Sequence, residues 1–232
     1  MLFGVAMDAV AVLIPAYDCA ATIAAVVAGA RRHVPRVLVV DDGSRDDTAA
    51  RAGEAGAEVL RQPGNRGKGA ALRAGLERLA ADGVTHVLTM DGDGQHLADE
   101  IPLLLAASAA APGAVIIGQR RIGDQEVTPI KLFGNRFANR WVEIACGRAL
   151  PDTQSGFRVY PLPATLRLGA RAERFAYETE VLIRAVRAGM EIRSVPVAVY
   201  YPPAAERVSH YRPWGDTLRI IAVVVGLILR RR

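Results

Sequence analysis

The feature that most constrains the fold of this chain is a repeated alternation of short apolar runs and helical stretches. Short runs typical of buried strands cover residues 10–14, 36–40, 58–61, 86–90 and 114–118. Stretches with helical character lie between them, at about 20–32, from about 46, at 68–81 and at about 98–110. Alternating elements of this length are typical of a parallel, doubly wound sheet. We therefore predict an α/β fold, with a Rossmann-like, mostly parallel sheet flanked by helices.

The second half of the sequence is less regular. Apolar residues recur at helical spacing over 128–146, residues 151–163 suggest a loop-rich hinge, a helix is predicted over 175–188, and 192–199 is predicted to be extended. The tail has ten apolar residues at 220–229 and then Arg230–Arg232. Because a membrane-spanning helix needs about 20 apolar residues, the tail is too short to span a bilayer. We predict a domain over 1–213 and an amphipathic, apolar C-terminal helix over 214–232 at a membrane interface. A core helix or an oligomer contact is the alternative.

Composition narrows the possible partners. The 232 residues are 51% hydrophobic, enough for a sizeable core, and carry a net charge of +5. A basic protein suits polyanions such as nucleic acids, nucleotide diphosphates or an anionic membrane surface. No Lys/Arg tract with interleaved aromatics is present, so nucleic acid is not expected as a partner. Cys19 and Cys146 form no CxxC pair, and the chain starts without a secretory signal pattern, so we expect free thiols in a reducing compartment.

Polar residues gather where three of the predicted strands end. Tyr17-Asp18, Asp41-Asp42 and the segment from Asp91 to Gln95 follow the first, second and fourth strands. Ligands of open α/β sheets bind outside the carboxyl ends of the strands. The three clusters therefore predict a binding site along one edge of the sheet.

The segment Asp91-Gly92-Asp93-Gly94-Gln95 carries the strongest chemical signal. In an extended segment, side chains two residues apart point the same way, so Asp91, Asp93 and Gln95 would share one side. Two carboxylates and an amide oxygen suit Mg²⁺ or Mn²⁺ and leave coordination positions for substrate phosphates. The alternative is a simple turn, since Asp and Gly favour turns. An EF-hand loop is disfavoured, because position twelve is Pro102.

Other candidates are weaker taken singly. Asp42 would accept hydrogen bonds from a nucleobase or ribose, or would only cap a helix. Lys68, between two glycines, would place a cation at a helix N-terminus that favours phosphate, but the segment is not a P-loop. The four histidines lack zinc-ligand spacing, and His96 would either support the acidic segment or lie in solvent.

Taken together, these motifs resemble the family 2 glycosyltransferases, closest to the dolichol-phosphate mannosyltransferase branch of polyprenyl-phosphate sugar synthases. The resemblance implies a GT-A fold and inverting transfer of a hexose from a nucleotide-diphosphate sugar. It implies Asp91, Asp93 and Gln95 as metal and diphosphate ligands and Arg120 as a contact of the acceptor phosphate. It also places Pro15, Tyr17, Asp42 and Lys68 around the nucleotide, and Ser155 and Arg158 on the acceptor side. The stretches that carry it are Ile14–Tyr17, Val40–Ser44 with Asp46 and Thr48, Gly67–Gly69, Met90–His96 and Ser155–Arg158.

The acceptor decides whether the reaction needs a base. A hydroxyl acceptor must lose a proton, whereas a lipid phosphate is already anionic and needs cations to hold it. If a base is required, Glu178 is the first candidate. The predicted catalytic residues are Asp93, Arg120 and Glu178. Glu178 and Glu180 would equally serve as first-turn acids of a helix.

The basic residues suggest where the protein works. Arg120, Arg121, Lys131, Arg136 and Arg140 suit an anionic lipid or form a solvated face. We expect a cytoplasmic, peripheral protein on the inner face of the cell membrane that acts on a lipid or lipid-phosphate acceptor. The alternatives are a saccharide or lipid hydroxyl acceptor, a nucleotidyltransferase, and a non-catalytic membrane-bound nucleotide-binding module. The nucleotidyltransferase is disfavoured, because no basic glycine-rich loop follows the first strand.

Overall fold

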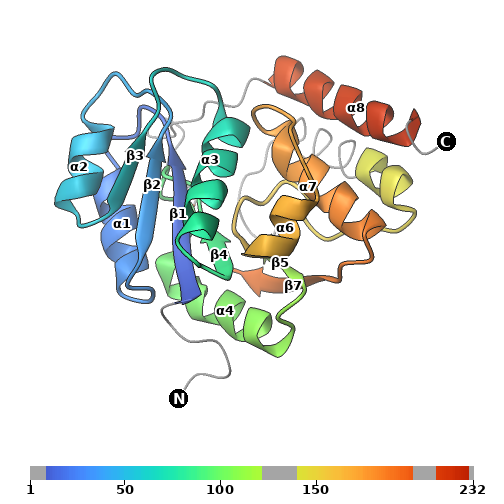
Figure 1. The fold of residues 1–232 in the computed structure, drawn as a ribbon, viewed down its shortest axis with the longest axis horizontal. Coiled ribbons are helices and arrows are strands. Elements are labelled where there is room, and N and C mark those ends of the chain that lie inside the picture. The colour runs from blue at the N-terminus through green and yellow to red at the C-terminus, as the bar shows by residue number, and fades with distance from the viewer. Residues whose placement is uncertain (1–8, 122–139, 201–212, 230–232) are drawn as a thin grey trace.

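A seven-stranded sheet forms the centre of the molecule (Figure 1). The computed structural model describes residues 9–121, 140–200 and 213–229. The strand order is β3-β2-β1-β4-β6-β5-β7, and among these strands only β6 runs antiparallel to its neighbours, β4 and β5. This arrangement confirms the predicted α/β fold with a mostly parallel sheet.

The observed elements follow the predicted order closely. The strands are β1 (Val10–Ala16), β2 (Val37–Asp41), β3 (Glu58–Arg61), β4 (His86–Thr89), β5 (Val115–Arg120), β6 (Arg158–Pro161) and β7 (Ile192–Val197). The helices are α1 (Ile23–Arg31), α2 (Thr48–Glu54), α3 (Lys68–Ala81), the short 3-10 helix η2 (Ala98–Glu100), α4 (Ile101–Ala110), α6 (Leu162–Arg167), α7 (Ala176–Arg187) and α8 (Pro213–Leu229). Residues 140–146 are also helical.

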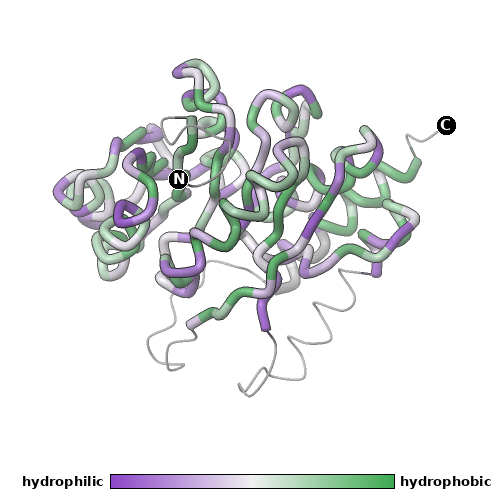
Figure 2. Tube along the Cα trace, turned by 90° about the horizontal axis from the view of Figure 1, so that it is seen from below, coloured by the Kyte–Doolittle hydropathy of each residue, from purple (hydrophilic) through white to green (hydrophobic). Residues whose placement is uncertain are grey.

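Alternation along the strands divides the core into two layers. Val12 and Ile14 of β1 belong to the apolar cluster that contains α1 and α4, whereas Ala11 and Leu13 belong to the cluster that contains α3 and α7. Successive side chains of a strand point to opposite faces, so a strand buried on both sides is apolar at most of its positions. Figure 2 shows this as hydrophobic colour through the interior, with hydrophilic colour concentrated on the surrounding segments.

The predicted loop-rich hinge over 151–163 is wrong in its second half. Residues 158–161 form β6, which lies between β4 and β5 with all four residues buried, and α6 follows at once. β6 contains Arg158 and ends at Pro161, and neither residue is expected in a central strand. Its antiparallel direction and its partners are set by β4 and β5, which are distant in sequence.

Helix α8 packs on the domain. Ile220, Val224 and Leu227 of α8 are buried in a third apolar cluster together with Val142 and Ile183. Their spacing puts them on one face of the helix, as expected of a helix docked on a core. No helix in the described part of the chain combines the length and the hydropathy needed to cross a membrane. Lys131 and Arg136, predicted to belong to a basic group, lie outside the described residues, and Arg121 and Arg140 are exposed.

Candidate active site

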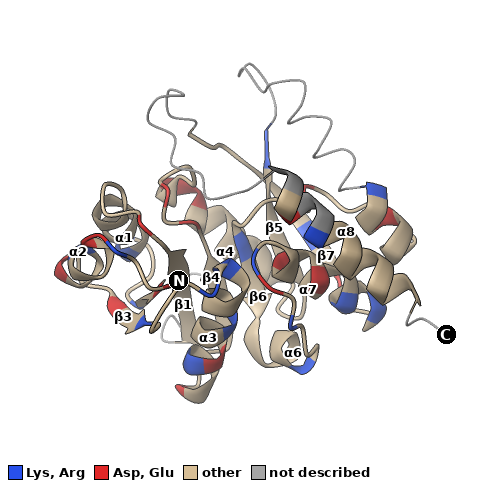
Figure 3. Cartoon of the chain, turned by 90° about the horizontal axis from the view of Figure 1, so that it is seen from above, with Lys and Arg blue, Asp and Glu red and all other residues tan. Residues whose placement is uncertain are grey.

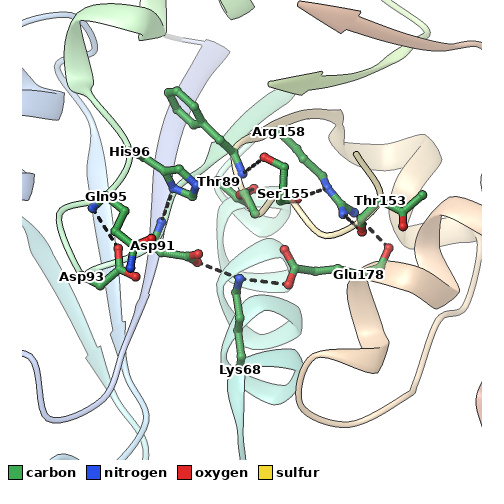
Figure 4. A network of polar contacts seen from close by, with 12 residues as sticks. Lys68, Thr89, Asp91, Asp93, Gln95, His96, Thr153, Ser155, Arg158 and Glu178 are labelled. Carbon is green, nitrogen blue, oxygen red and sulfur yellow. Dashed lines mark hydrogen bonds and ion pairs between the residues drawn. The ribbon is translucent and has the colours of Figure 1, made fainter. Parts of the chain in front are cut away.

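The candidate site lies where the parallel strands β1, β2 and β4 end. Figure 3 looks toward this side of the molecule, with charged residues of both signs where these strands meet α3 and α7. The chain leaves β4 at Thr89 and turns through Gly92–Gly94, with φ +77° at Gly94. The sequence suggested an extended segment from Asp91 to Gln95, but the structure has a turn there. The turn directs Asp91 and Asp93 differently, as the close-up in Figure 4 shows.

Lys68 joins two carboxylates from distant parts of the chain. Its Nζ lies 2.7 Å from Oδ1 of Asp91 and 2.9 Å from Oε2 of Glu178. The ammonium is also 5.7 Å from the centre of the Phe175 ring. Burial alone would lower the pKa of Lys68, but the charges of Asp91 and Glu178 outweigh it and raise the pKa. The side chain therefore stays charged, a fixed cation beside the acidic turn.

Within the described residues, no Lys or Arg forms an ion pair with Asp93. Its Oδ1 accepts the backbone N–H of Gln95 at 3.0 Å. Burial raises the pKa of Asp93 to about 6, and the negative charge of Asp91 adds to the rise. For Asp91, burial would raise the pKa, but the Lys68 ammonium lowers it below its usual range. A second cation near Asp93 would relieve the repulsion between these carboxylates.

The residues present fit a hard divalent cation. Asp91, Asp93 and Gln95 offer only oxygen ligands, which Mg²⁺ and Mn²⁺ prefer. In the described part of the chain, no three His, Cys, Asp or Glu side chains cluster closely enough to hold an ion. A cation at this turn would therefore complete its coordination with Gln95, water or a ligand, as Mg²⁺ does at phosphate sites.

His96 supports the turn from behind. Its ring is buried and stacks on Phe157, with the ring centres 4.9 Å apart. Its Nδ1 accepts the backbone N–H of Asp91 at 3.1 Å, which places the ring proton on Nε2. Burial lowers the pKa of His96 to about 4, so the ring is neutral at pH 7. Of the two roles considered for His96, support of the acidic segment agrees with the structure.

The turn before β6 packs against the Lys68–Asp91 ion pair. Thr89 donates its hydroxyl to the carbonyl of Gly156 at 2.9 Å, which ties β4 to this turn. A Cβ atom on Gly156 would lie 2.7 Å from Nζ of Lys68 and 3.0 Å from both carboxylate oxygens of Asp91. No side chain fits there without moving the ion pair, so glycine is required for this packing.

The predicted contact of Ser155 and Arg158 with the acceptor does not agree with their burial. Arg158 is 0% exposed, and its guanidinium donates to the carbonyls of Ser155, Thr153 and Glu178 at 2.7–2.9 Å. Ser155 is also buried, and its Oγ accepts the N–H of Phe157 at 3.3 Å. Both residues lie behind the site and hold the turn before β6 against the start of α7.

Arg120 ends β5 beside the site. Its Nε and Nη2 donate to the carboxylate of Asp152 at 2.7 and 2.8 Å, a two-point contact that fixes the guanidinium plane. Burial would raise the pKa of Asp152, but Arg120 lowers it. The positive charge of Arg120 also contributes to lowering the pKa values of Asp91 and His96. Arg120 thus adds positive potential at the edge where the acidic turn lies.

The residues predicted to contact the nucleotide lie along the same edge. Pro15 and Tyr17 are partly buried at the end of β1. Asp42, after β2, is 3% exposed, and its oxygens accept the backbone N–H groups of Arg66 and Gly67 at 2.8 and 2.6 Å. Asp42 therefore shapes the loop that leads into α3 and positions Lys68.

Glu178 and Glu180, the two late acids, differ in their surroundings. Glu178 faces Lys68, and its Oε1 is buried with no hydrogen-bond partner in the described part of the chain. Glu180 accepts the backbone N–H groups of Arg171 and Ala172 at 2.8 and 2.6 Å and pairs with Arg184. Glu180 is a loop anchor, whereas Glu178 belongs to the site.

Comparison with known sequences decides the family. The family model for glycosyl transferase family 2 matches residues 11–164, more than half of the chain, and this span includes Lys68, the acidic turn and β6. The chain belongs to glycosyl transferase family 2. The predicted family is confirmed.

Relatives and solved structures agree with this family 2 assignment. The chain is 34% identical over 199 residues to glycosyltransferase AglJ of Haloferax volcanii, covering 84% of this chain and 64% of that protein. It is 30% identical over 200 residues to an undecaprenyl-phosphate mannosyltransferase of Micrococcus luteus, covering 80% of this chain and 81% of that protein. The fold matches glucosyl-3-phosphoglycerate synthase of Mycobacterium tuberculosis, crystallised with Mn²⁺, UDP and phosphoglyceric acid. That match has a TM-score of 0.72 at 23% identity and covers 96% of this chain and 78% of that one.

Some residues of this family 2 glycosyltransferase site could not be identified from motifs. Phe157, Thr89 and Phe175 contribute through packing or single hydrogen bonds, and no spacing rule marks them. Gly156 offered one signal, since a glycine before a strand often marks close backbone approach. The pairing of Lys68 with Glu178 depends on how α3 and α7 pack, which local sequence does not specify.

Proposed function

We propose that this chain transfers a hexose from a nucleotide-diphosphate sugar to a polyprenyl phosphate such as dolichyl phosphate, with inversion at the sugar carbon. Mg²⁺ or Mn²⁺ would be held by Asp91, Asp93 and Gln95. The observation that carries the proposal is the carboxylate of Asp93, which has a raised pKa and no ion-pair partner among the described residues, beside the Lys68–Asp91 ion pair. The names of relatives, such as the undecaprenyl-phosphate mannosyltransferase, support this acceptor class.

Each charged group has a distinct task in this proposal. The bound cation would neutralise the departing diphosphate. Lys68 adds a second positive charge next to Asp91, at the N-terminus of α3, where backbone N–H groups favour phosphate. His96 holds the backbone of Asp91, so the turn keeps its shape when charge develops. Arg120, fixed by Asp152, attracts the acceptor phosphate toward this edge.

The surroundings of Glu178 favour an anionic acceptor. One of its oxygens is engaged by the Lys68 ammonium, and the other is enclosed in the protein. A general base must reach the proton it takes, within about 3 Å or through one water. A lipid phosphate needs no such base. A hydroxyl acceptor is the second candidate, because the unpartnered Oε1 of Glu178 would accept a hydrogen bond from a hydroxyl that reached it.

We also propose that the protein lies on the cytoplasmic, inner face of the cell membrane. Ile221 and Val225 of α8 are only partly buried, and Leu229 is 71% exposed. Three arginines follow this helix in the sequence. Apolar side chains next to basic ones favour an anionic lipid surface, where the acceptor would be found.

A transfer assay tests the proposal. Full-length protein is incubated with Mn²⁺, labelled UDP- and GDP-hexoses, and liposomes that contain either a polyprenyl phosphate or the matching polyprenol. We expect product with the phosphate, none with the polyprenol, and loss of product after metal chelation. Product with only the polyprenol, or with a saccharide, would support the hydroxyl acceptor. Liposome binding without nucleotide affinity or transfer would indicate a non-catalytic module.

The variant Glu178→Gln separates the two acceptors. If Glu178 is a general base, its loss should reduce turnover by about 10²–10⁴-fold. If the acceptor is a phosphate, Glu178 only holds Lys68, and we expect a loss of about tenfold or less. Thermal unfolding of the variant provides the control for folding.

A further inference from the structure

A buried ion pair joins helix α8 to the segment that borders the candidate site. Asp216, in the first turn of α8, is 1% exposed, and its Oδ1 accepts a hydrogen bond from Nε of Arg174 at 3.0 Å. The half-exposed Arg219 contacts the same oxygen at 3.2 Å. A buried carboxylate is costly unless it is paired, so the ion pair with Asp216 favours a position of Arg174 that keeps its guanidinium close by.

Arg174 has a backbone conformation that side chains rarely adopt, with φ +53°. The segment around it, residues 171–175, is fixed at two points. Oε2 of Glu180 in α7 accepts the N–H groups of Arg171 and Ala172, and Asp216 in α8 accepts from Arg174. The last residue of the segment, Phe175, places its ring beside the Lys68 ammonium.

The 171–175 segment packs directly on the start of α3. A Cβ atom on Gly69 would lie 2.9 Å from the carbonyl oxygen of Ala172 and 2.8 Å from that of Arg174. A Cβ atom on Gly67 would lie 2.7 Å from Cγ of Arg174. Lys68 stands between these two glycines. The position of the 171–175 segment therefore sets the position of the first turn of α3, and with it the ammonium that bridges Asp91 and Glu178.

We propose that Asp216 is a positioning residue through which α8 sets the geometry of the metal and diphosphate site. By holding Arg174, α8 holds the 171–175 segment on α3 and keeps Lys68 against Asp91. The site is complete only while α8 is docked on α7, which it overlies in Figure 1. The identity of the ligand rests on the proposed function, but the coupling itself rests on these contacts.

A purely structural role for α8 makes a different prediction. Ile220 and Val224 bury apolar surface against the domain and stabilise it whatever the position of Lys68. If that were the whole role of α8, loss of the ion pair would lower the unfolding temperature but would leave ligand affinity unchanged in folded protein. Affinity measured well below the unfolding temperature therefore distinguishes the two roles.

The test compares Asp216→Asn with the matched control Arg219→Gln in the full chain. Arg219→Gln removes a contact of the same carboxylate and leaves Arg174 in place. The ligand is Mn²⁺ with UDP or GDP, whichever stabilises the wild type. Affinity is measured by calorimetry, and the Mn²⁺ environment is monitored by electron paramagnetic resonance. We expect Asp216→Asn to weaken binding about tenfold and to change the Mn²⁺ spectrum, whereas Arg219→Gln should change affinity less than about twofold.

Arg174→Gln keeps the proposal testable if Asp216→Asn fails to fold. It removes the other partner of the ion pair and should weaken binding to the same extent. Wild-type affinity in a folded Asp216→Asn or Arg174→Gln protein would overturn the coupling, as would an equal loss in Arg219→Gln. Absence of nucleotide binding by the wild type would instead contradict the proposed function, so the two failures are distinguishable.

Discussion

The carboxylates that follow β2 and β4, at the same edge of the sheet, have different surroundings. After β2, Asp42 is buried and accepts two backbone N–H groups, from Arg66 and Gly67. After β4, Asp93 accepts one backbone N–H, and the negative charge of Asp91 repels its own. Both follow a buried strand, and both were predicted to contact substrate.

The difference separates a carboxylate that shapes the protein from one that we propose binds a ligand. Backbone N–H groups that point at Asp42 fix the loop into α3 and use its hydrogen-bonding capacity. Burial and the charge of Asp91 raise the pKa of Asp93, and no ion pair among the described residues offsets this, a pattern that is typical of functional sites. A substitution of Asp42 should therefore mainly affect stability, whereas a substitution of Asp93 should mainly affect ligand binding.

The largest effect is expected for Asp93→Asn. Loss of one of two carboxylate ligands should reduce Mn²⁺-dependent nucleotide binding and transfer by about 100-fold or more, with little change in the unfolding temperature. The measurements are calorimetry with Mn²⁺ and a nucleoside diphosphate, and the transfer assay. Asp99→Asn is the control, because the Asp99 side chain is 82% exposed and pairs with the exposed Arg32. Equal activity in both variants would remove the basis for a metal at the acidic turn.

Asp42→Ala should show the opposite pattern. It leaves the backbone N–H groups of Arg66 and Gly67 without their acceptor in a buried loop, at a cost of about 2 kcal/mol in the free energy of unfolding. For a chain of this size, that corresponds to about 4–8 °C in the unfolding temperature. Affinity for Mn²⁺ alone should stay within about threefold. A stable Asp42→Ala protein that had lost its affinity for nucleotide would contradict this separation and show that Asp42 acts on the ligand, by direct contact or through the position of Lys68.

Gly156→Ala tests how the turn before β6 packs against the Lys68–Asp91 ion pair. The added methyl group would press on Lys68 and Asp91, and we expect transfer to fall about tenfold, since small displacements at reacting groups are costly. Gly113→Ala is a matched control, because no atom lies within 4 Å of its added Cβ. If Gly156→Ala kept full activity, the ion pair would have to tolerate displacement, and its proposed role in positioning would be wrong.

Regular elements with local signals were predictable from the sequence. The bounds predicted for α3 and β3 agree with the structure, because both have a clear periodicity and turn residues at their ends. Helix α1 starts at Ile23 rather than near 20, and the N–H groups of Cys19 and Ala20 before it donate to Thr48 and Asp46. Such a start depends on a loop that is distant in sequence.

The site was predictable in its members but not in their arrangement. Asp91 and Lys68 each stand in a recognisable motif and Glu178 was a candidate acid, but only the packing of α3, β4 and α7 brings the three together. The family resemblance placed Arg158 on the acceptor side, but carbonyl oxygens that the folded turn supplies account for its burial. A motif thus indicates the residue types of a site, whereas the donors and acceptors around them come from the tertiary fold.

The smallest expected effect is a pH dependence of metal binding. Because the pKa of Asp93 is raised to about 6 in the metal-free protein, protons compete with the cation as the pH falls toward and below this value. Between pH 7 and pH 5.5, the affinity for Mn²⁺ alone should fall about fourfold, the change in the ionised fraction of a group with this pKa. His96, with a pKa of about 4, stays neutral over this range and contributes little. Titration followed by electron paramagnetic resonance measures the affinity, and an affinity independent of pH would mean that Asp93 either is not a ligand or carries no raised pKa.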